Sequence, residues 1–153
     1  AADPEVERIV VPIDFSETSR AALRYAGSMA SIYAVPVRLV HVIEPPTMPS
    51  AYGLEAPKVT SRTVQARAEQ ALDEWGRDLR DEGPEVSYVV RRGDPTAQIL
   101  DVASAATDFL VMGTHGRAGI QRVVLGSVTE GVLSQAQGPV LSGRDFPANT
   151  SLH

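Results

Sequence analysis

Short apolar segments alternate with longer amphipathic segments along almost the whole chain, and this alternation limits the folds open to it. The apolar segments lie at residues 8–13, 37–43, 86–90, 109–112 and 138–141. The segments between them carry apolar residues three or four positions apart, which is the spacing of a helix. Strands that alternate with helices predict an α/β fold with a parallel sheet, and right-handed crossovers place helices on both faces. At 153 residues the chain is expected to form one domain.

The helical segments carry start and stop signals. Ser16 and Asp94 are expected to cap the first and third helices, with Pro95 in the first turn of the third. Gly83 and Pro84 are expected to end the second helix. The apolar stripes are Ala22, Ala26, Met29 and Ile32 or Tyr33; then Val64, Ala68, Leu72, Trp75 and Leu79; then Ile99, Leu100, Ala103 and Ala106. Residues 44–57 contain four prolines and no periodicity, so they predict a long loop, which either closes over the site or runs across the surface.

Residues 109–133 carry the strongest functional signal. The apolar run 109–112 stops abruptly at Gly113, and Gly116 follows three positions later. Gly126 and Ser127 then open a helical pattern. The apolar positions of this pattern are Val128, Val132, Leu133 and Ala136. Because the first turn of a helix offers unpaired N–H groups and the positive end of the helix dipole, the stretch predicts a phosphate site.

A plain structural explanation accounts for some of the same residues. Ser127 and Glu130 have the spacing of a capping box, in which each residue satisfies the backbone of the other. Asp14 and Glu17 have the same spacing at the first helix. Glycine after a strand is also common in turns. Residue types alone therefore leave a ligand site and a helix cap equally open.

The spacing favours the ligand site. Gly113, Gly116, Gly126 and Ser127 form the pattern G-x2-G-x9-G-S, which resembles the nucleotide-binding signature of the ATP-binding branch of the universal stress protein family. The resemblance extends through residues 9–16, 39–42, 108–113 and 139–141. A P-loop would need a lysine where Gly126 stands, and a Rossmann fingerprint would need glycines at the first strand, which it lacks.

The resemblance implies a single doubly wound, Rossmann-like domain over residues 1–143, similar to the adenine nucleotide alpha hydrolases, and a C-terminal tail over 144–153. The implied sheet has five parallel strands in the order 3-2-1-4-5. In this order the first and fourth strands flank the topological switch point, where such sheets bind ligands. Fold logic and the glycine pattern therefore predict the same crevice.

The resemblance also implies which residues hold the nucleotide. The set is Pro12, Asp14, Val42, Gly113, His115, Gly116, Arg117, Gly126, Ser127 and Val128. Asp14 and the backbone of Val42 belong to the ribose and base, while the glycines and Ser127 belong to the phosphates and ribose. His115 and Arg117 are either phosphate contacts or exposed loop residues. His41, a lone histidine on a strand, is expected to be packed and hydrogen-bonded rather than functional.

Charge and composition narrow the partners. The formal net charge of -5 argues against nucleic acid, because such a partner requires a basic face. A bound nucleotide would need local positive charge, for which Arg117 and Arg122 are the expected sources, together with a divalent ion such as Mg or Mn on the phosphates. No apolar run approaches the roughly 18 residues of a membrane span, so we expect no membrane contact and a cytoplasmic protein. The absence of cysteine excludes disulfides and thiolate metal sites.

Three functions remain open at the level of sequence. The leading one is an ATP-binding regulator or sensor in the stress response. The second is a dimeric interaction protein that keeps the fold and does not use nucleotide. The third is a slow ATPase or a nucleotidyl-transfer enzyme, although no residue is clearly placed as a catalytic base and no catalytic residue is assigned.

The fifth strand bears on assembly. The resemblance implies a homodimer in which the fifth strands, at Pro139 to Leu141, meet across an edge. The chain departs from the family here, because Ser142 and Gly143 stand where relatives continue with β-branched residues. An edge strand leaves backbone groups unpaired, so we expect a homodimer whose contact also uses the neighbouring helix or the tail.

Overall fold

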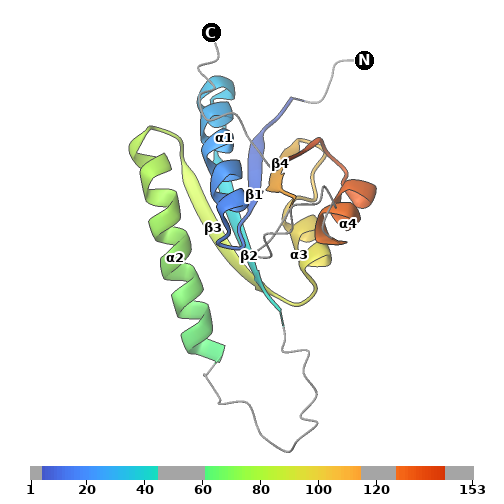
Figure 1. The fold of residues 1–153 in the computed structure, drawn as a ribbon. Helices are drawn as coiled ribbons and strands as arrows, with labels where there is room; N and C mark the ends of the chain where they lie inside the picture. The colour runs from blue at the N-terminus through green and yellow to red at the C-terminus, as the bar shows by residue number, and fades with distance from the viewer. Residues whose placement is uncertain (1–4, 45–60, 115–126, 144–153) are drawn as a thin grey trace, which may run out of the picture.

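The computed structural model describes residues 5–44, 61–114 and 127–143. The strands are β1 (Arg8–Pro12), β2 (Val37–Ile43), β3 (Val86–Arg92), β4 (Asp108–Gly113) and β5 (Val140–Gly143). The helices are α1 (Glu17–Tyr33), α2 (Ser61–Asp81), α3 (Pro95–Val102) and α4 (Ser127–Gln135). All four strand pairs are parallel and the order is β3-β2-β1-β4-β5, so the predicted doubly wound α/β fold is confirmed (Figure 1). None of the described helices is long and apolar enough to cross a membrane.

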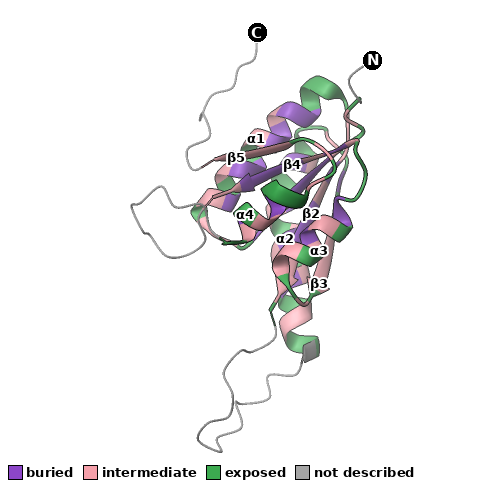
Figure 2. Ribbon diagram, turned by 90° about the vertical axis from the view of Figure 1, so that its right-hand side faces the viewer, coloured by how far each residue is buried: buried purple, intermediate pink, exposed green. Residues whose placement is uncertain are grey.

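The sheet separates two apolar layers because neighbouring side chains of a strand point to opposite faces. On β1, Ile9 and Val11 pack with α1 and α2, whereas Val10 packs with α3 and α4. All three side chains are fully buried, as expected for a central parallel strand. Figure 2 shows the buried residues concentrated in the strands and on the inward sides of the helices. Both faces of the sheet are therefore covered, and its edges remain for ligands or partners.

The predicted helix caps are confirmed. The Ser16 side chain accepts a hydrogen bond from the backbone N–H of Ser19, and Asp94 accepts one from Ala97. Pro95 occupies the first turn of α3. Helix α2 ends at Asp81, shortly before Gly83 and Pro84. Ser16 lies four residues after the carboxyl end of β1, and Asp94 lies two residues after that of β3.

The last turn of α1 differs from the prediction. Ile32 and Tyr33 are 53% and 54% exposed, although the apolar stripe placed them in the core. The helix ends with Ala34 in the left-handed conformation, and the N–H groups of Ala34 and Val35 both bond to the carbonyl of Ala30. This turn reverses the chain so that Val35, rather than the last helical residues, packs on the core.

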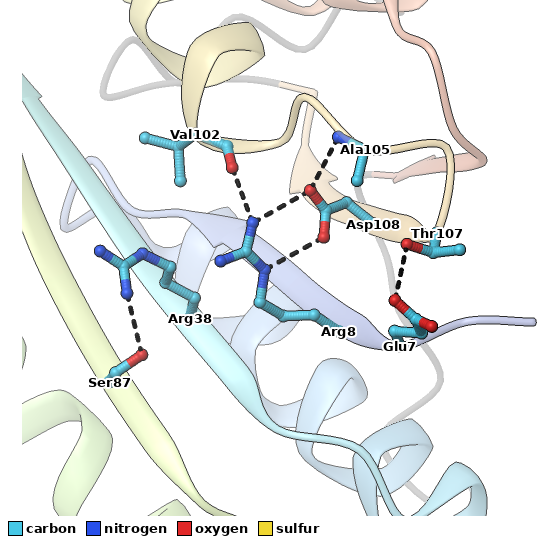
Figure 3. A network of polar contacts seen from close by, with 8 residues as sticks. All are labelled: Glu7, Arg8, Arg38, Ser87, Val102, Ala105, Thr107 and Asp108. Carbon is cyan, nitrogen blue, oxygen red and sulfur yellow. Dashed lines mark hydrogen bonds and ion pairs between the residues drawn. The ribbon is translucent and has the colours of Figure 1, made fainter.

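Helix α3 is shorter than predicted and stops at Val102 instead of reaching Ala106. A polar network captures its end (Figure 3). The guanidinium of Arg8 donates to the Val102 carbonyl at 2.8 Å and to both carboxylate oxygens of Asp108 at 3.0 Å. Asp108 also accepts from the Ala105 N–H at 3.1 Å and is only 4% exposed. The network joins the amino ends of β1 and β4 to the chain between α3 and β4.

Strand β5 continues through the residues that depart from the family pattern. Ser142 pairs with Met112, Gly143 pairs with Gly113, and the Thr114 N–H donates to the Gly143 carbonyl at 3.1 Å. A backbone ladder needs no particular side chain, so serine and glycine can complete it. The predicted strand is confirmed and extends two residues further than the apolar pattern.

Helices α3 and α4 approach closely at Gly131. A β-carbon at this position would lie 2.8 Å from the Thr96 methyl carbon and 3.0 Å from its hydroxyl oxygen. Gly131→Ala is expected to lower the free energy of unfolding by about 1 kcal/mol, because overpacking outweighs the better helix propensity of alanine. Adding Thr96→Ala should restore the loss. Urea unfolding of both variants checks this, and a single variant as stable as the wild type would contradict the close packing.

Candidate functional site

A pocket of about 300 Å³ opens at the carboxyl edge of the sheet, where β1 and β4 diverge into connections on opposite faces. This is the switch point at which doubly wound sheets bind ligands. The lining residues are Pro12, Ile13, Asp14, Thr18, Ser19, Val40, His41, Val42, Glu44, Pro95, Ile99, Met112, Gly113, Thr114, Ser127, Val128 and Thr129. The pocket is therefore built from three strand ends and the first turns of three helices.

The three helix starts give the pocket part of its electrostatic character. Residues from the first turns of α1, α3 and α4 all line it, and the first turn of a helix carries free N–H groups and the positive end of the dipole. The described lining otherwise holds two carboxylates, Asp14 and Glu44, and the imidazole of His41, and it contains no lysine or arginine. Arg117 and Arg122, the predicted sources of positive charge, lie outside the described residues, and those described contain no cluster of metal-binding side chains.

The turn between β1 and α1 is strained. Phe15 has a φ of 64°, a left-handed conformation that costs a residue with a bulky side chain about 1–3 kcal/mol. The Asp14 carboxylate closes the turn, because its Oδ1 atom accepts from the Ser16 N–H at 2.9 Å and also from the Ser16 hydroxyl. Within the described part of the chain the second carboxylate oxygen, Oδ2, accepts no such bond. Asp14 thus lines the pocket while its Oδ1 atom is bonded to Ser16.

An aromatic cluster holds this turn from the α1 and α2 side of the sheet. We define it as Phe15, His41 and Trp75, with the Arg20 guanidinium above the indole. The Phe15 ring lies 4.8 Å from the His41 ring and 5.3 Å from the Trp75 ring between centroids, the second contact being edge to face. Arg20 lies 4.2 Å from the centroid of Trp75. These separations are those of attractive aromatic and cation–π contacts.

His41 is packed and hydrogen-bonded, as predicted. Its Nδ1 atom lies 2.7 Å from the Ile13 carbonyl oxygen, and since a carbonyl only accepts, Nδ1 carries the proton. His41 also lines the pocket, a position that the single-histidine argument did not anticipate. The residue therefore joins the pocket to the aromatic cluster.

Gly113 has a packing role beside any ligand role. A β-carbon there would lie 2.9 Å from the Cβ and Oγ1 atoms of Thr18 and 3.0 Å from its backbone carbon. The glycine therefore lets the end of β4 approach the first turn of α1. Thr129, which is 3% exposed, fixes α4 to the same place by donating its hydroxyl to the Gly113 carbonyl at 3.4 Å. The glycine pattern predicts close approach of a ligand at Gly113 and does not predict this contact with α1.

The structure brings together six of the ten predicted binding residues. Pro12, Asp14, Val42, Gly113, Ser127 and Val128 all line the pocket, although they lie in four separate parts of the chain. His115, Gly116, Arg117 and Gly126 lie outside the described residues. Ser127 is the first described residue of α4 and is exposed.

Sequence reasoning missed several lining residues, chiefly Thr18, Thr114 and Thr129. Thr18 lies in the first turn of α1 next to Glu17, and Thr129 lies in the first turn of α4 next to Val128. A threonine at an inward position of a helix start is a usable signal, because a buried hydroxyl needs a partner. Pro95 and Ile99 had been assigned to a helix start and to the core, and both also reach the pocket.

The fold and the pocket together define a doubly wound α/β protein with a ligand pocket at its switch point. Comparison with known proteins makes this more specific. The sequence model of the universal stress protein family matches residues 5–142. The chain belongs to this family.

Individual relatives agree with this assignment. Universal stress protein MJ0577 of Methanocaldococcus jannaschii is 28% identical over 150 residues, which cover 88% of this chain and 93% of the relative. A solved structure of MJ0577 has a TM-score of 0.76 over 92% of this chain and 98% of that one. Universal stress protein Rv2005c of Mycobacterium tuberculosis is 32% identical over 144 residues, covering 93% of this chain and 47% of the longer relative.

One further structure contains a nucleotide. The universal stress protein of Archaeoglobus fulgidus was solved in complex with dAMP. It matches this chain at a TM-score of 0.64 and 24% identity, covering 89% of this chain and 96% of that one. At this identity the likeness is one of fold.

Proposed function

We propose that this protein binds ATP in the switch-point pocket and acts in the cytoplasm as a nucleotide-dependent regulator or sensor of the stress response. The observation that carries the proposal is the meeting of Asp14, Val42, Gly113 and the start of α4 around one pocket. The resemblance of the sequence to the family pattern independently implies that Asp14, Val42 and Gly113 contact a nucleotide. The dAMP complex of the Archaeoglobus fulgidus relative supports a nucleotide as the ligand class.

The proposed binding mode divides the pocket in two. Asp14 and the backbone of Val42 hold the ribose and base. Gly113 and Ser127, together with Gly116 and Gly126, surround the phosphates and ribose at the amino end of α4, and His115 and Arg117 contact phosphate. Because the described lining carries two carboxylates and no lysine or arginine, a Mg or Mn ion on the phosphates would reduce repulsion.

The proposal is tested by what the purified protein contains. We expect denaturation to release an adenine nucleotide that mass analysis identifies, and we expect the emptied protein to bind Mg-ATP. If no nucleotide is released and none binds at millimolar Mg-ATP, the nucleotide-independent interaction protein becomes the better explanation. Release of ADP from bound ATP over minutes would instead favour the slow ATPase.

We further propose a homodimer formed through β5. The strand stands at the edge of the sheet, and all its residues are partly exposed. An edge strand invites pairing with a second copy, and a two-fold contact closes it symmetrically. The strand is short, so the contact would also use α4, where Leu133 is 41% exposed, or the proposed tail of residues 144–153.

The dimer can be tested by light scattering at micromolar concentration, with and without residues 144–153. We expect the mass of two chains for the full sequence. A monomer in both cases would contradict the dimer. Loss of the dimer on truncation alone would assign part of the contact to the tail.

A further inference from the structure

Phe15 connects two residues of interest. It follows Asp14, which lines the pocket, and its ring contacts Trp75, the single tryptophan of the sequence. The Phe15 backbone is left-handed at a φ of 64°. A phenylalanine without further contacts would relax to a negative φ. Such a change of the Phe15 backbone would also rotate the neighbouring residue Asp14. Something must therefore hold Phe15 in place, and the hydrogen bonds of Ser16 to Asp14 span the turn without fixing the Phe15 side chain.

The ring contacts supply that hold. The Phe15 ring touches His41 on β2 and Trp75 on α2, two elements distant from the turn in sequence. His41 is itself fixed by the bond between its Nδ1 atom and the Ile13 carbonyl, one residue before Asp14. Release of the turn would cost both ring contacts, so the strained backbone and the aromatic cluster stabilise each other.

The ring contacts also connect the pocket with helix α2. His41 lines the pocket and Phe15 touches His41, whereas Trp75 lies behind them on α2 and does not line the pocket. Trp75 is half-buried, with Arg20 of α1 over its ring. A movement of the turn on ligand binding would therefore shift the Phe15 ring and, through it, Trp75 at the surface formed by α1 and α2. By linkage, a change at that surface alters ligand affinity equally.

We propose that Phe15 is a positioning residue, which holds Asp14 for the nucleotide and couples filling of the pocket to helix α2 through Trp75. This inference rests on the proposed ATP site. It adds a mode of regulation to that site: a partner that binds over Trp75 and Arg20 would sense whether nucleotide is present. The sequence contains a single tryptophan, so tryptophan emission reports on the surroundings of Trp75, which include Phe15 and Arg20.

The test uses Mg-ATP, with affinity measured by titration calorimetry and the Trp75 emission followed in the same titration. In the wild type we expect binding accompanied by a change in emission. Phe15→Ala keeps the backbone strain and removes the ring, so affinity should fall about tenfold, or 1.4 kcal/mol, and the emission change should disappear. Phe15→Tyr keeps the ring and should preserve both.

Phe15→Gly separates the two roles. Glycine adopts a left-handed backbone without strain, so Asp14 keeps its position and affinity should stay within about threefold of the wild type. The ring is nevertheless absent, so the emission change should still disappear. A matched control is Phe109→Ala, which removes a partly buried ring from the same core cluster without touching the turn. It should lower stability and leave affinity and the emission change intact.

The outcomes are distinguishable. Normal Mg-ATP affinity in Phe15→Ala would overturn the positioning role, and a full emission change in Phe15→Gly would overturn the coupling. The same losses in Phe109→Ala would show a general effect of destabilisation and would overturn both. Failure of the wild type to bind Mg-ATP would overturn the proposed function and this inference with it.

Discussion

Val128→Trp is expected to reduce affinity for Mg-ATP more than tenfold, which corresponds to at least about 1.4 kcal/mol. Val128 lies in the first turn of α4, lines the pocket and is only partly buried, so an indole at this position has room only on the pocket side. Calorimetric titration of the folded variant measures the loss. Wild-type affinity in a folded Val128→Trp protein would contradict the placement of nucleotide at the start of α4.

Leu133→Trp is the matched control for this substitution. Leu133 lies in the same helix, is 41% exposed and does not line the pocket. The same indole should therefore leave Mg-ATP affinity unchanged. Equal losses in both variants would indicate that α4 is simply intolerant of tryptophan.

Arg8→Met should lower the free energy of unfolding by about 3 kcal/mol, the largest stability effect expected from one substitution in this chain. The change leaves the Asp108 carboxylate, which is 4% exposed, with only the Ala105 N–H as a partner. Removing one member of a buried ion pair costs about 3–5 kcal/mol, and the partial exposure of Arg8 places this case at the lower end. Urea unfolding followed by circular dichroism measures it.

Two comparisons test the origin of that loss. Arg38→Met removes a partly buried arginine whose hydrogen bond to Ser87 is long and exposed, so it should change stability by no more than about 0.5 kcal/mol. Combining Arg8→Met with Asp108→Asn removes the unpaired charge, and the double variant should be more stable than Arg8→Met alone. A double variant with fully additive losses would contradict the ion-pair explanation.

The parts of the fold that follow from local periodicity could be predicted from sequence. The strand β2 lies where the apolar run placed it, and Ser16 and Asp94 cap their helices because a side-chain oxygen before a helix serves the nearest N–H groups. The exposure of Ile32 and Tyr33 and the early end of α3 could not be predicted this way. The early end of α3 depends on a contact between distant residues, that of Arg8 with Val102. The exposure of Ile32 and Tyr33 follows from the left-handed turn at Ala34, an alanine that gives no signal for such a conformation.

The predicted binding site likewise has a part that follows from the sequence and a part that only the structure shows. The glycine pattern and the strand order predict the carboxyl ends of β1 and β4, where the pocket lies, since both follow from spacing along the chain. The strained turn at Phe15 and the close contact of Gly113 with Thr18 require knowledge of which helix starts beside which strand. The sequence position of Phe15 between an aspartate and a serine gives no sign of a left-handed backbone.

The Arg8–Asp108 network joins the amino ends of β1 and β4 (Figure 3), whereas the pocket lies at the carboxyl ends of the same two strands. Because residues that share no partners and lie far apart contribute independently to stability, a loss caused by a substitution around the pocket adds to a loss caused at the amino ends of the strands without enlarging it. A variant of the pocket therefore keeps the full contribution that the Arg8–Asp108 network makes to stability. Exposed pocket positions such as Asp14 can change while this network helps to keep the fold above its stability threshold.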